Sequence, residues 1–270
     1  MTASDWSGVA TAWSAESEYV ERVKAPLTAR MLELLDLQAG ERVLELGCGT
    51  GALALRLADA VAPGGTVLAT DIATGMVEVA RTRLAGCAGV DVDEADAVKT
   101  DLPEASFDAV VFRMGLMFVE EPAAALREAR RVLVEGGRFA AAVWAGPAAN
   151  PWLSTVGMAA MLAGVVAGGP PTGPGGLFSL SEPTALEAAA REGGFMDVQV
   201  ESVPLVSVFR DANEHFDHVR ALAGPLAAAL AKADDATLDK VRSTHRDLAA
   251  GYLTEDGLRF PAEALLLVAR

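Results

Sequence analysis

The sequence predicts an α/β fold, with a doubly wound, mostly parallel seven-stranded sheet and a helical cap. Apolar runs alternate strictly with helix-forming runs between residues 42 and 144, which is typical of strand–helix–strand units. The strand-like runs are nearly continuously apolar, as in strands covered by helices on both faces. After residue 144 the rhythm stops, and Gly, Pro and Ala dominate residues 145–180.

Seven segments are expected to form strands. The sixth alternates between apolar and polar residues, and the seventh is strongly apolar. The sixth is expected to break at Pro204, because proline has no N–H to donate to a strand partner. The segments are 42–47, 66–72, 90–96, 107–113, 138–144, 196–209 and 258–270.

The helices are bounded by capping and stop signals. Thr74 and Ser181 are candidate N-caps, and glycines follow most of the periodic runs. Residues 1–24 are expected to form a polar helical arm. The other expected helices are 25–40, 51–62, 74–86, 122–137 (ending at a Gly-Gly pair) and 181–194, with more helix in 211–250.

The chain is expected to be one domain over residues 1–270, because neither a repeat nor a separating linker is evident. The arm (1–24) and two insertions that form the cap (145–180 and 211–256) are additions to it. Residues 139–181 carry no charge, but five prolines interrupt them, so a membrane span is not expected.

Charge and cysteine usage narrow the partners. The net charge of −15 disfavours nucleic acid and anionic membranes. The two cysteines, Cys48 and Cys87, form neither a disulfide framework nor a zinc pattern, and the N-terminus lacks an apolar signal region. We therefore expect a cytoplasmic protein with reduced thiols, without metal.

The stretch "RVLELGCGTGALA" (42–54) places Gly47, Gly49 and Gly51 where a strand passes into a helix. Bare backbone lets a ligand approach, and a helix N-terminus offers unpaired N–H groups. Asp71 ends the next strand, 20 residues after Gly51, where a carboxylate can accept both ribose hydroxyls. Together these features predict a nucleotide site.

Two nucleotides compete for this turn. Gly47, Gly49 and Ala52 fit the G-x-G-x-x-A form of the dinucleotide fingerprint. Glu45 with Gly47, Gly49 and Gly51 fits acid-x-G-x-G-x-G, the pattern for S-adenosylmethionine. Glu45 favours the second, because a carboxylate would repel a pyrophosphate but suits a cationic amino group.

"VLELGCGTG" resembles the first motif of class I S-adenosylmethionine-dependent methyltransferases. "TDIATGMVEVAR" resembles their ribose-binding acid and the helix after it, and residues 94–144 resemble the later motifs of the ubiquinone and menaquinone biosynthesis subgroup. The resemblance covers residues 25–145 and implies a Rossmann-like fold. It specifies the cofactor, S-adenosyl-L-methionine, and leaves the acceptor open.

The resemblance assigns cofactor contacts by position. Glu45 and the glycine turn would hold the methionine part, Asp71 the ribose, and Ile72 the adenine face, with Asp96 at the adenine amino group. Arg113 would lie near the methionine tail. The full set is Glu45, Gly47, Cys48, Gly49, Gly51, Asp71, Ile72, Asp96, Ala97, Arg113 and Trp13, the last as an aromatic cover.

The function implied is methyl transfer by in-line displacement to a small, fairly apolar acceptor, such as a phenol, a quinone-like molecule or a natural-product scaffold. This reaction requires that the acceptor is aligned with the methyl carbon and that water is excluded, and it needs a base only when the acceptor must lose a proton. The alternatives are an NAD-dependent oxidoreductase, and a protein of this fold that binds the cofactor without transferring methyl.

Residues for catalysis and for the acceptor are less well marked. "NEHFDHV" sets His215 and His218 on one helical face, either as a solvated surface or as a base in a cap helix, and His245 is expected at the surface. The apolar cap segment predicts an acceptor pocket. Its candidate residues are Trp152, Met158, Leu162 and Phe178; core packing or a homodimer contact are the alternatives.

Overall fold

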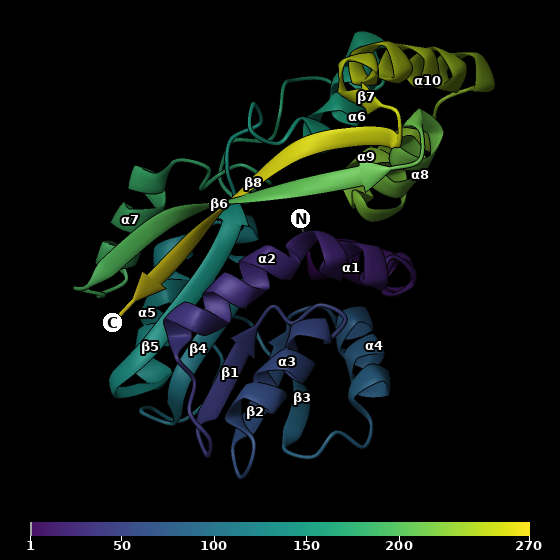
Figure 1. Ribbon diagram of the computed structural model, residues 1–270. Coiled ribbons are helices and arrows are strands. Elements are labelled where there is room, and N and C mark those ends of the chain that lie inside the picture. Colours follow the sequence, from purple (N-terminus) through teal and green to yellow (C-terminus); the bar gives the residue numbers. More distant parts are fainter. Residues whose placement is uncertain (1) are drawn as a thin grey trace.

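The protein, described here by a computed structural model over residues 2–270, is built around one sheet (Figure 1). The strands are β1 (Arg42–Leu46), β2 (Thr66–Asp71), β3 (Val90–Glu94), β4 (Phe107–Arg113), β5 (Leu133–Trp144), β6 (Val198–Phe209), β7 (Leu253–Thr254) and β8 (Gly257–Ala269). Their order is β3-β2-β1-β4-β5-β8-β6, with the short β7 paired to β8. Strands β1 to β5 are parallel, and β8 is antiparallel to both of its long neighbours. The predicted α/β class with a mostly parallel sheet is confirmed, but the sheet has eight strands, because the short β7 joins the seven that were predicted.

The strand order reverses between β1 and β4, so successive crossovers place helices on both faces of the sheet. The helices are α1 (Ala3–Ala15), α2 (Ser17–Leu35), α3 (Ala52–Val61), α4 (Thr74–Leu84), η1 (Leu116–Phe118), α5 (Pro122–Val132), α6 (Pro151–Leu162), α7 (Pro183–Glu192), α8 (Ala212–Leu222), α9 (Gly224–Leu230), α10 (Asp235–Ala249) and η2 (Ala250–Tyr252). Helices α2, α3 and α4 pack in a row, and α5 packs on α7.

Two predicted helix boundaries are wrong. Helix α2 begins at Ser17 and continues through Pro26, because the apolar face that buries Val20 and Leu27 stays in register across the proline. Helix α5 ends at Val132, and the Gly-Gly pair expected to stop it lies inside β5, next to an irregularity in the pairing with β4.

The predicted break at Pro204 is also wrong. Strand β6 runs continuously from Val198 to Phe209, and Pro204 lies opposite Glu263 of β8. Strand β6 is the last in the sheet order, and an edge strand tolerates a residue without an N–H because one of its sides has no strand partner.

The cap is assembled from two distant parts of the chain. Helix α6, from residues 145–180, packs on α8 and α10, from residues 211–256, around Val156, Phe216 and Val241. Figure 1 shows β6 and β8 reaching beyond the parallel strands toward this cap, and α1 lying between the cap helices and α4. Within residues 2–270, no helix combines the length and apolarity needed to cross a membrane.

Candidate cofactor site

The turn between β1 and α3 depends on its three glycines, which all have positive φ angles of 61°, 55° and 79°. A Cβ added to Gly47 would lie 2.8 Å from the Phe112 ring, and one added to Gly51 would lie 2.9 Å from Leu84. A Cβ on Gly49 would meet nothing within 4 Å. Packing therefore requires glycine at 47 and 51, whereas Gly49 faces open space that a ligand can enter.

Asp71, at the end of β2, is tied to this turn. Its Oδ2 accepts a hydrogen bond of 2.8 Å from the Gly49 N–H, and its Oδ1 accepts one of 2.9 Å from the Ala73 N–H. The side chain is buried, and burial raises the pKa of its carboxyl group against the effect of these donors. Each carboxylate oxygen keeps a second lone pair, so hydroxyl donors can still bind.

Glu45 lies one residue before the end of β1 and is only 2 % exposed. Its Oε2 is buried and has no hydrogen-bond partner among residues 2–270. Burial raises the pKa of Glu45 to about 8; Glu21 and Asp71 add to the effect, and Arg113 opposes it. A buried carboxyl oxygen without a partner is unfavourable, so this site is suited to a ligand that brings a cationic donor.

Arg113, at the end of β4, is held by α2. Its guanidinium donates to both carboxylate oxygens of Glu21, at 2.8 and 2.6 Å, and to the Thr28 hydroxyl at 2.7 Å. Its side chain is 7 % exposed. The charge of Arg113 acts on Glu45, and its hydrogen bonds fix α2 against the sheet.

Lys24, from the same face of α2, was not predicted from the sequence. Its side chain is buried, makes no hydrogen bond or ion pair with the part of the chain described here, and lies over Trp13, with Nζ 5.4 Å from the ring centre. Burial and the charge of Arg113 lower its pKa to about 7, against the opposing effect of Glu21. The available signal was the spacing of Glu21, Lys24 and Thr28, which sets three polar side chains on one face of a helix.

The residues expected around the adenine lie in loops beyond β2 and β3. Ile72 is 44 % exposed directly after Asp71, so it offers an apolar surface beside the ribose position. Asp96 is exposed and Ala97 is half-buried; the Asp96 carboxylate accepts a hydrogen bond from the Val98 N–H at 2.9 Å. The other predicted residue of the turn, Cys48, is buried, and burial raises the pKa of its thiol.

Helix α1 covers the same end of the sheet. The Gly75 N–H of α4 donates to the Ser7 hydroxyl at 3.1 Å, and the Trp13 indole donates to the Leu222 carbonyl of α8 at 3.3 Å. Trp6 packs edge-on against Phe118, with ring centres 4.8 Å apart. Trp13 is therefore placed between Lys24 and the cap.

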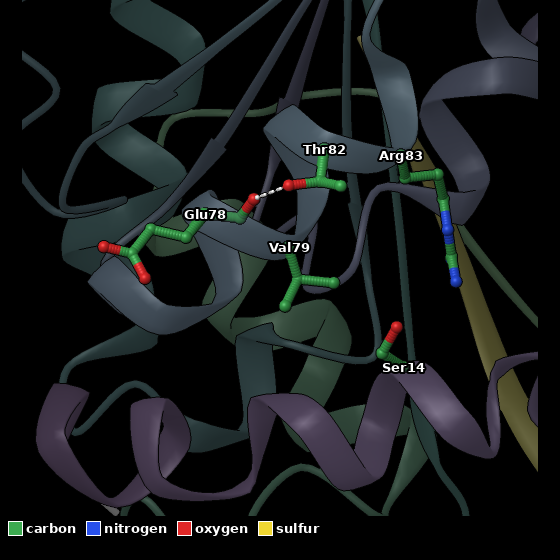
Figure 2. A pocket seen from close by; sticks show the side chains of 5 residues that line it. All are labelled: Ser14, Glu78, Val79, Thr82 and Arg83. Atoms are coloured by element: carbon green, nitrogen blue, oxygen red, sulfur yellow. Dashed lines mark hydrogen bonds between the residues drawn. The ribbon is translucent and has the colours of Figure 1, made fainter.

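Two hollows flank the glycine turn. The larger, of about 430 Å³, lies between α1 and α4 and is drawn in Figure 2, where Ser14 faces Val79 and Thr82 across the gap. Arg83 also lines it and donates to the Thr50 hydroxyl in the turn at 3.0 Å. The smaller, of about 130 Å³, lies between α2 and α3. Its lining residues are Glu21, Ala25, Thr28, Ala52 and Arg56.

The cap histidines are buried, so the expectations of a solvated helix face and of a surface His245 are wrong. His215 contacts the Trp152 carbonyl through Nε2 at 2.8 Å, and its Nδ1 lies 2.9 Å from His245 Nε2. His218 Nδ1 lies 2.8 Å from the Glu16 carboxylate. Residues 213–219 (NEHFDHV) look polar when read alone, but α1, α6 and α10 pack around α8 and cover its histidines.

Of the four residues expected in an acceptor pocket, two are buried and two are exposed. Trp152 is buried and packs edge-on against Trp144, with ring centres 5.4 Å apart. Phe178 is buried in the main core. Met158 and Leu162 are 41 % and 56 % exposed on the outer side of α6, away from the face that buries Trp152, which argues against them as pocket residues.

Comparison with known proteins agrees with this geometry. Residues 44–141 match the family described as "Methyltransferase domain". The demethylmenaquinone methyltransferase of Clavibacter sepedonicus is 50% identical over 103 residues, which are 37% of this chain and 40% of that protein. This chain therefore spans less than half of the length of that relative.

Solved structures support the fold over most of the chain. The YcgJ protein of Bacillus subtilis is 21% identical, with a TM-score of 0.59 over 90% of this chain and 96% of that one. The [4+2]-cyclase SpnF is also 21% identical, with a TM-score of 0.54 over 98% and 95%. The matched region runs from β1 into β5 and contains the glycine turn, Asp71 and Arg113. The chain therefore contains a class I S-adenosylmethionine-dependent methyltransferase domain.

Proposed function

We propose that the protein transfers the methyl group of S-adenosylmethionine to a small, fairly apolar acceptor. The observation that carries the proposal is the buried, unpaired Oε2 of Glu45 next to a turn that is open at Gly49. A ligand at this place needs a cationic donor and a shape that passes close to bare backbone. The methionine end of the cofactor has both properties.

The donor set fits the whole cofactor. Glu45 would accept from the amino group, and Lys24, which makes no ion pair within residues 2–270, would meet the carboxylate. Asp71 would accept from the ribose hydroxyls, with Ile72 and Asp96 at the adenine. The bound sulfonium supplies an electrophilic methyl carbon. The chain aligns the acceptor with that carbon and excludes water from it.

The cap supports an apolar acceptor. Ala142 of β5 pairs with Arg113 of β4, so Trp144 lies two residues beyond that pair, at the carboxyl edge of the sheet. Trp152 of α6 packs on Trp144 from the cap side. The name of the Clavibacter relative, a demethylmenaquinone methyltransferase, adds support for a quinone-like or phenolic ring as the acceptor.

Binding and turnover test the proposal separately. Calorimetry with S-adenosylhomocysteine is expected to show binding, and NADH is expected to show none, because its pyrophosphate has no cationic donor to offer Glu45. A mass-spectrometric screen of phenols, quinones and apolar amines is then expected to show methylated product. Binding of NADH alone would favour the oxidoreductase. Cofactor binding without product from any acceptor would favour a protein that keeps the fold without methyl transfer.

A further inference from the structure

His218 differs from the other buried histidines in what its two ring nitrogens contact. His215 is committed on both sides: Nε2 lies 2.8 Å from the Trp152 carbonyl, so it carries the proton, and Nδ1 accepts from His245. His218 uses only Nδ1, which lies 2.8 Å from Glu16. Its Nε2 is buried and has no partner in residues 2–270.

The carboxylate partner fixes the tautomer of His218. A carboxylate accepts but does not donate, so Nδ1 carries the proton and Nε2 presents a lone pair. Burial lowers the pKa of His218 in spite of Glu16 and Glu214, which keeps the ring neutral near pH 7. A neutral imidazole held by a carboxylate, with its other nitrogen unoccupied, is the arrangement of a general base.

An unpaired donor lies beside this unpaired acceptor. The indole N–H of Trp152 is also buried without a partner, and its ring centre is 6.5 Å from that of His218. Tyr19 and Phe209 pack on the same imidazole, with ring centres 4.5 and 5.3 Å away. A ligand hydroxyl between the two rings would donate to His218 Nε2 and accept from the indole, and the surrounding rings suit an aromatic molecule; the Tyr19 hydroxyl also has no hydrogen-bond partner within residues 2–270.

Two chains of contacts connect His218 with the cofactor end of the sheet. Trp152 packs on Trp144, which lies two residues after Ala142, the strand partner of Arg113. Glu16, which caps α2, and Glu21, which holds Arg113, are five residues apart, about 7.5 Å along a helix. These contacts link His218 to the edge of the sheet where Trp144 and Arg113 lie.

We propose that the acceptor is an aromatic hydroxyl compound and that His218 is its general base, positioned by Glu16. This inference rests on the proposed methyl transfer. As the phenol oxygen attacks the methyl carbon, the O–C bond forms and the C–S bond breaks, leaving S-adenosylhomocysteine. The phenolic proton moves to His218 Nε2, and the Glu16 carboxylate stabilises the resulting imidazolium. Tyr19 does not act as the base, because burial raises the pKa of its hydroxyl, which therefore stays protonated.

The test compares phenols that need a base with phenols that do not. Simple phenol and catechol are protonated at pH 8, whereas 4-nitrophenol is largely ionised. His218→Gln is expected to lower kcat for phenol or catechol by about 100-fold or more, with KM within about threefold, since a general base contributes on that scale. The loss with 4-nitrophenol is expected to be under about tenfold. Glu16→Gln is expected to lower kcat by an intermediate factor and to change the pH at which kcat rises. The titratable groups around the His218 ring are Glu16, Tyr19, Glu214 and His215.

Asp217→Asn, on the exposed side of α8, is the matched control and is expected to behave as the wild type. Calorimetry with S-adenosylhomocysteine separates the two proposals. If the cofactor does not bind the wild type, the proposed function fails. If it binds equally to wild type and His218→Gln, but the variant loses the same factor with ionised and protonated phenols, the base role is overturned. Turnover of amines and of no phenol would overturn the acceptor class.

Nitrogen NMR gives a readout that does not require turnover. In the wild-type protein, His218 is expected to show a protonated Nδ1 and an unprotonated Nε2, and the Nε2 resonance is expected to move on titration with 4-methylphenol. The opposite tautomer, or no response at a phenol concentration that inhibits or supports turnover, would contradict the proposal.

Discussion

The backbone N–H of Gly49 donates to Asp71 Oδ2 at 2.8 Å, so the acid after β2 holds the turn after β1. The glycine turn and Asp71, which the sequence predicts as parts of one site, form one structural unit. Asp71 fixes Gly49, which faces open space, and the same carboxylate is proposed to receive the ribose. A substitution at Asp71 therefore removes a ligand contact and a support of the turn together.

Asp71→Ala is expected to weaken S-adenosylhomocysteine binding at least tenfold. Two hydrogen bonds to a charged group are lost, at about 1.5–3 kcal/mol each. Asp71→Asn retains one acceptor oxygen and is expected to fall between the wild type and Asp71→Ala. Isothermal calorimetry measures the three affinities, and thermal unfolding shows whether each variant is folded. Unchanged affinity in a folded Asp71→Ala protein would remove the ribose role.

Gly49→Val is expected to abolish cofactor binding while the fold survives, because the new side chain enters open space that the cofactor needs. Gly49→Ala is the milder form. The control is Gly64→Ala: Gly64 has a φ of 86° and the same freedom from contacts, but it lies in the turn after α3. Both alanine variants carry a left-handed strain of about 1–2 kcal/mol. Equal loss of affinity in the two would show that strain, and not occupancy, is the cause.

The predicted order of elements was sound where short-range patterns determine structure. The strand after residue 41, the glycine turn and Asp71 were placed correctly because apolar runs and turn glycines act locally. The start of α2 was misplaced, since the burial that carries the helix across Pro26 comes from the sheet and not from neighbours in sequence. The Gly-Gly pair was misread for the same reason: strand pairing with β4 overrides its stop signal.

Within the site, the missed residues all lie on helices whose partners are distant in sequence. Lys24 is separated by 89 positions from Arg113, whose charge helps to lower its pKa. His218 was misjudged as solvated because much of its cover comes from Tyr19 of α2 and Trp152 of α6, which are distant in sequence. A polar residue on an amphipathic helix gives no sign of whether water or another helix faces it.

Cofactor binding near pH 7 is expected to move protons in two opposing directions. Glu45, with a pKa of about 8 in the free protein, is mostly protonated at pH 7, and a cationic amino group favours its carboxylate, so a proton is released. Lys24, with a pKa of about 7, is about half neutral, and a ligand carboxylate favours its ammonium, so a proton is taken up.

Calorimetry in buffers with different ionisation enthalpies measures the net proton count. Relative to the wild type, Glu45→Gln is expected to shift the count toward uptake and Lys24→Met toward release, both with weaker binding. The ligand's own amino group contributes equally in every variant. If neither substitution changes the count, Glu45 and Lys24 do not meet the charged ends of the cofactor.

The cap is expected to lose stability as the pH falls below about 6.5. Burial lowers the pKa of His215 to about 3 and that of His245 to about 4, and the pKa of His218 is also lowered. Between these values and the unfolded pKa of about 6.5, the unfolded chain binds protons that the folded cap does not. Stability is therefore fully present above about pH 6.5 and decreases on acidification, by up to about 1.4 kcal/mol per pH unit for each histidine.

Glu45 acts in the opposite sense over part of this range, because its raised pKa favours the folded state at low pH. The comparison between variants is thus more informative than the wild-type slope. His245→Gln keeps a side-chain N–H for His215 and removes one titrating group, so urea unfolding between pH 7 and 5 is expected to give a slope smaller by up to about 1.4 kcal/mol per pH unit. Lys240→Gln, an exposed substitution on the same helix, is the matched control and is expected to leave the slope unchanged. Identical slopes for the wild type and His245→Gln would mean that His245 is solvated or already charged in the folded cap.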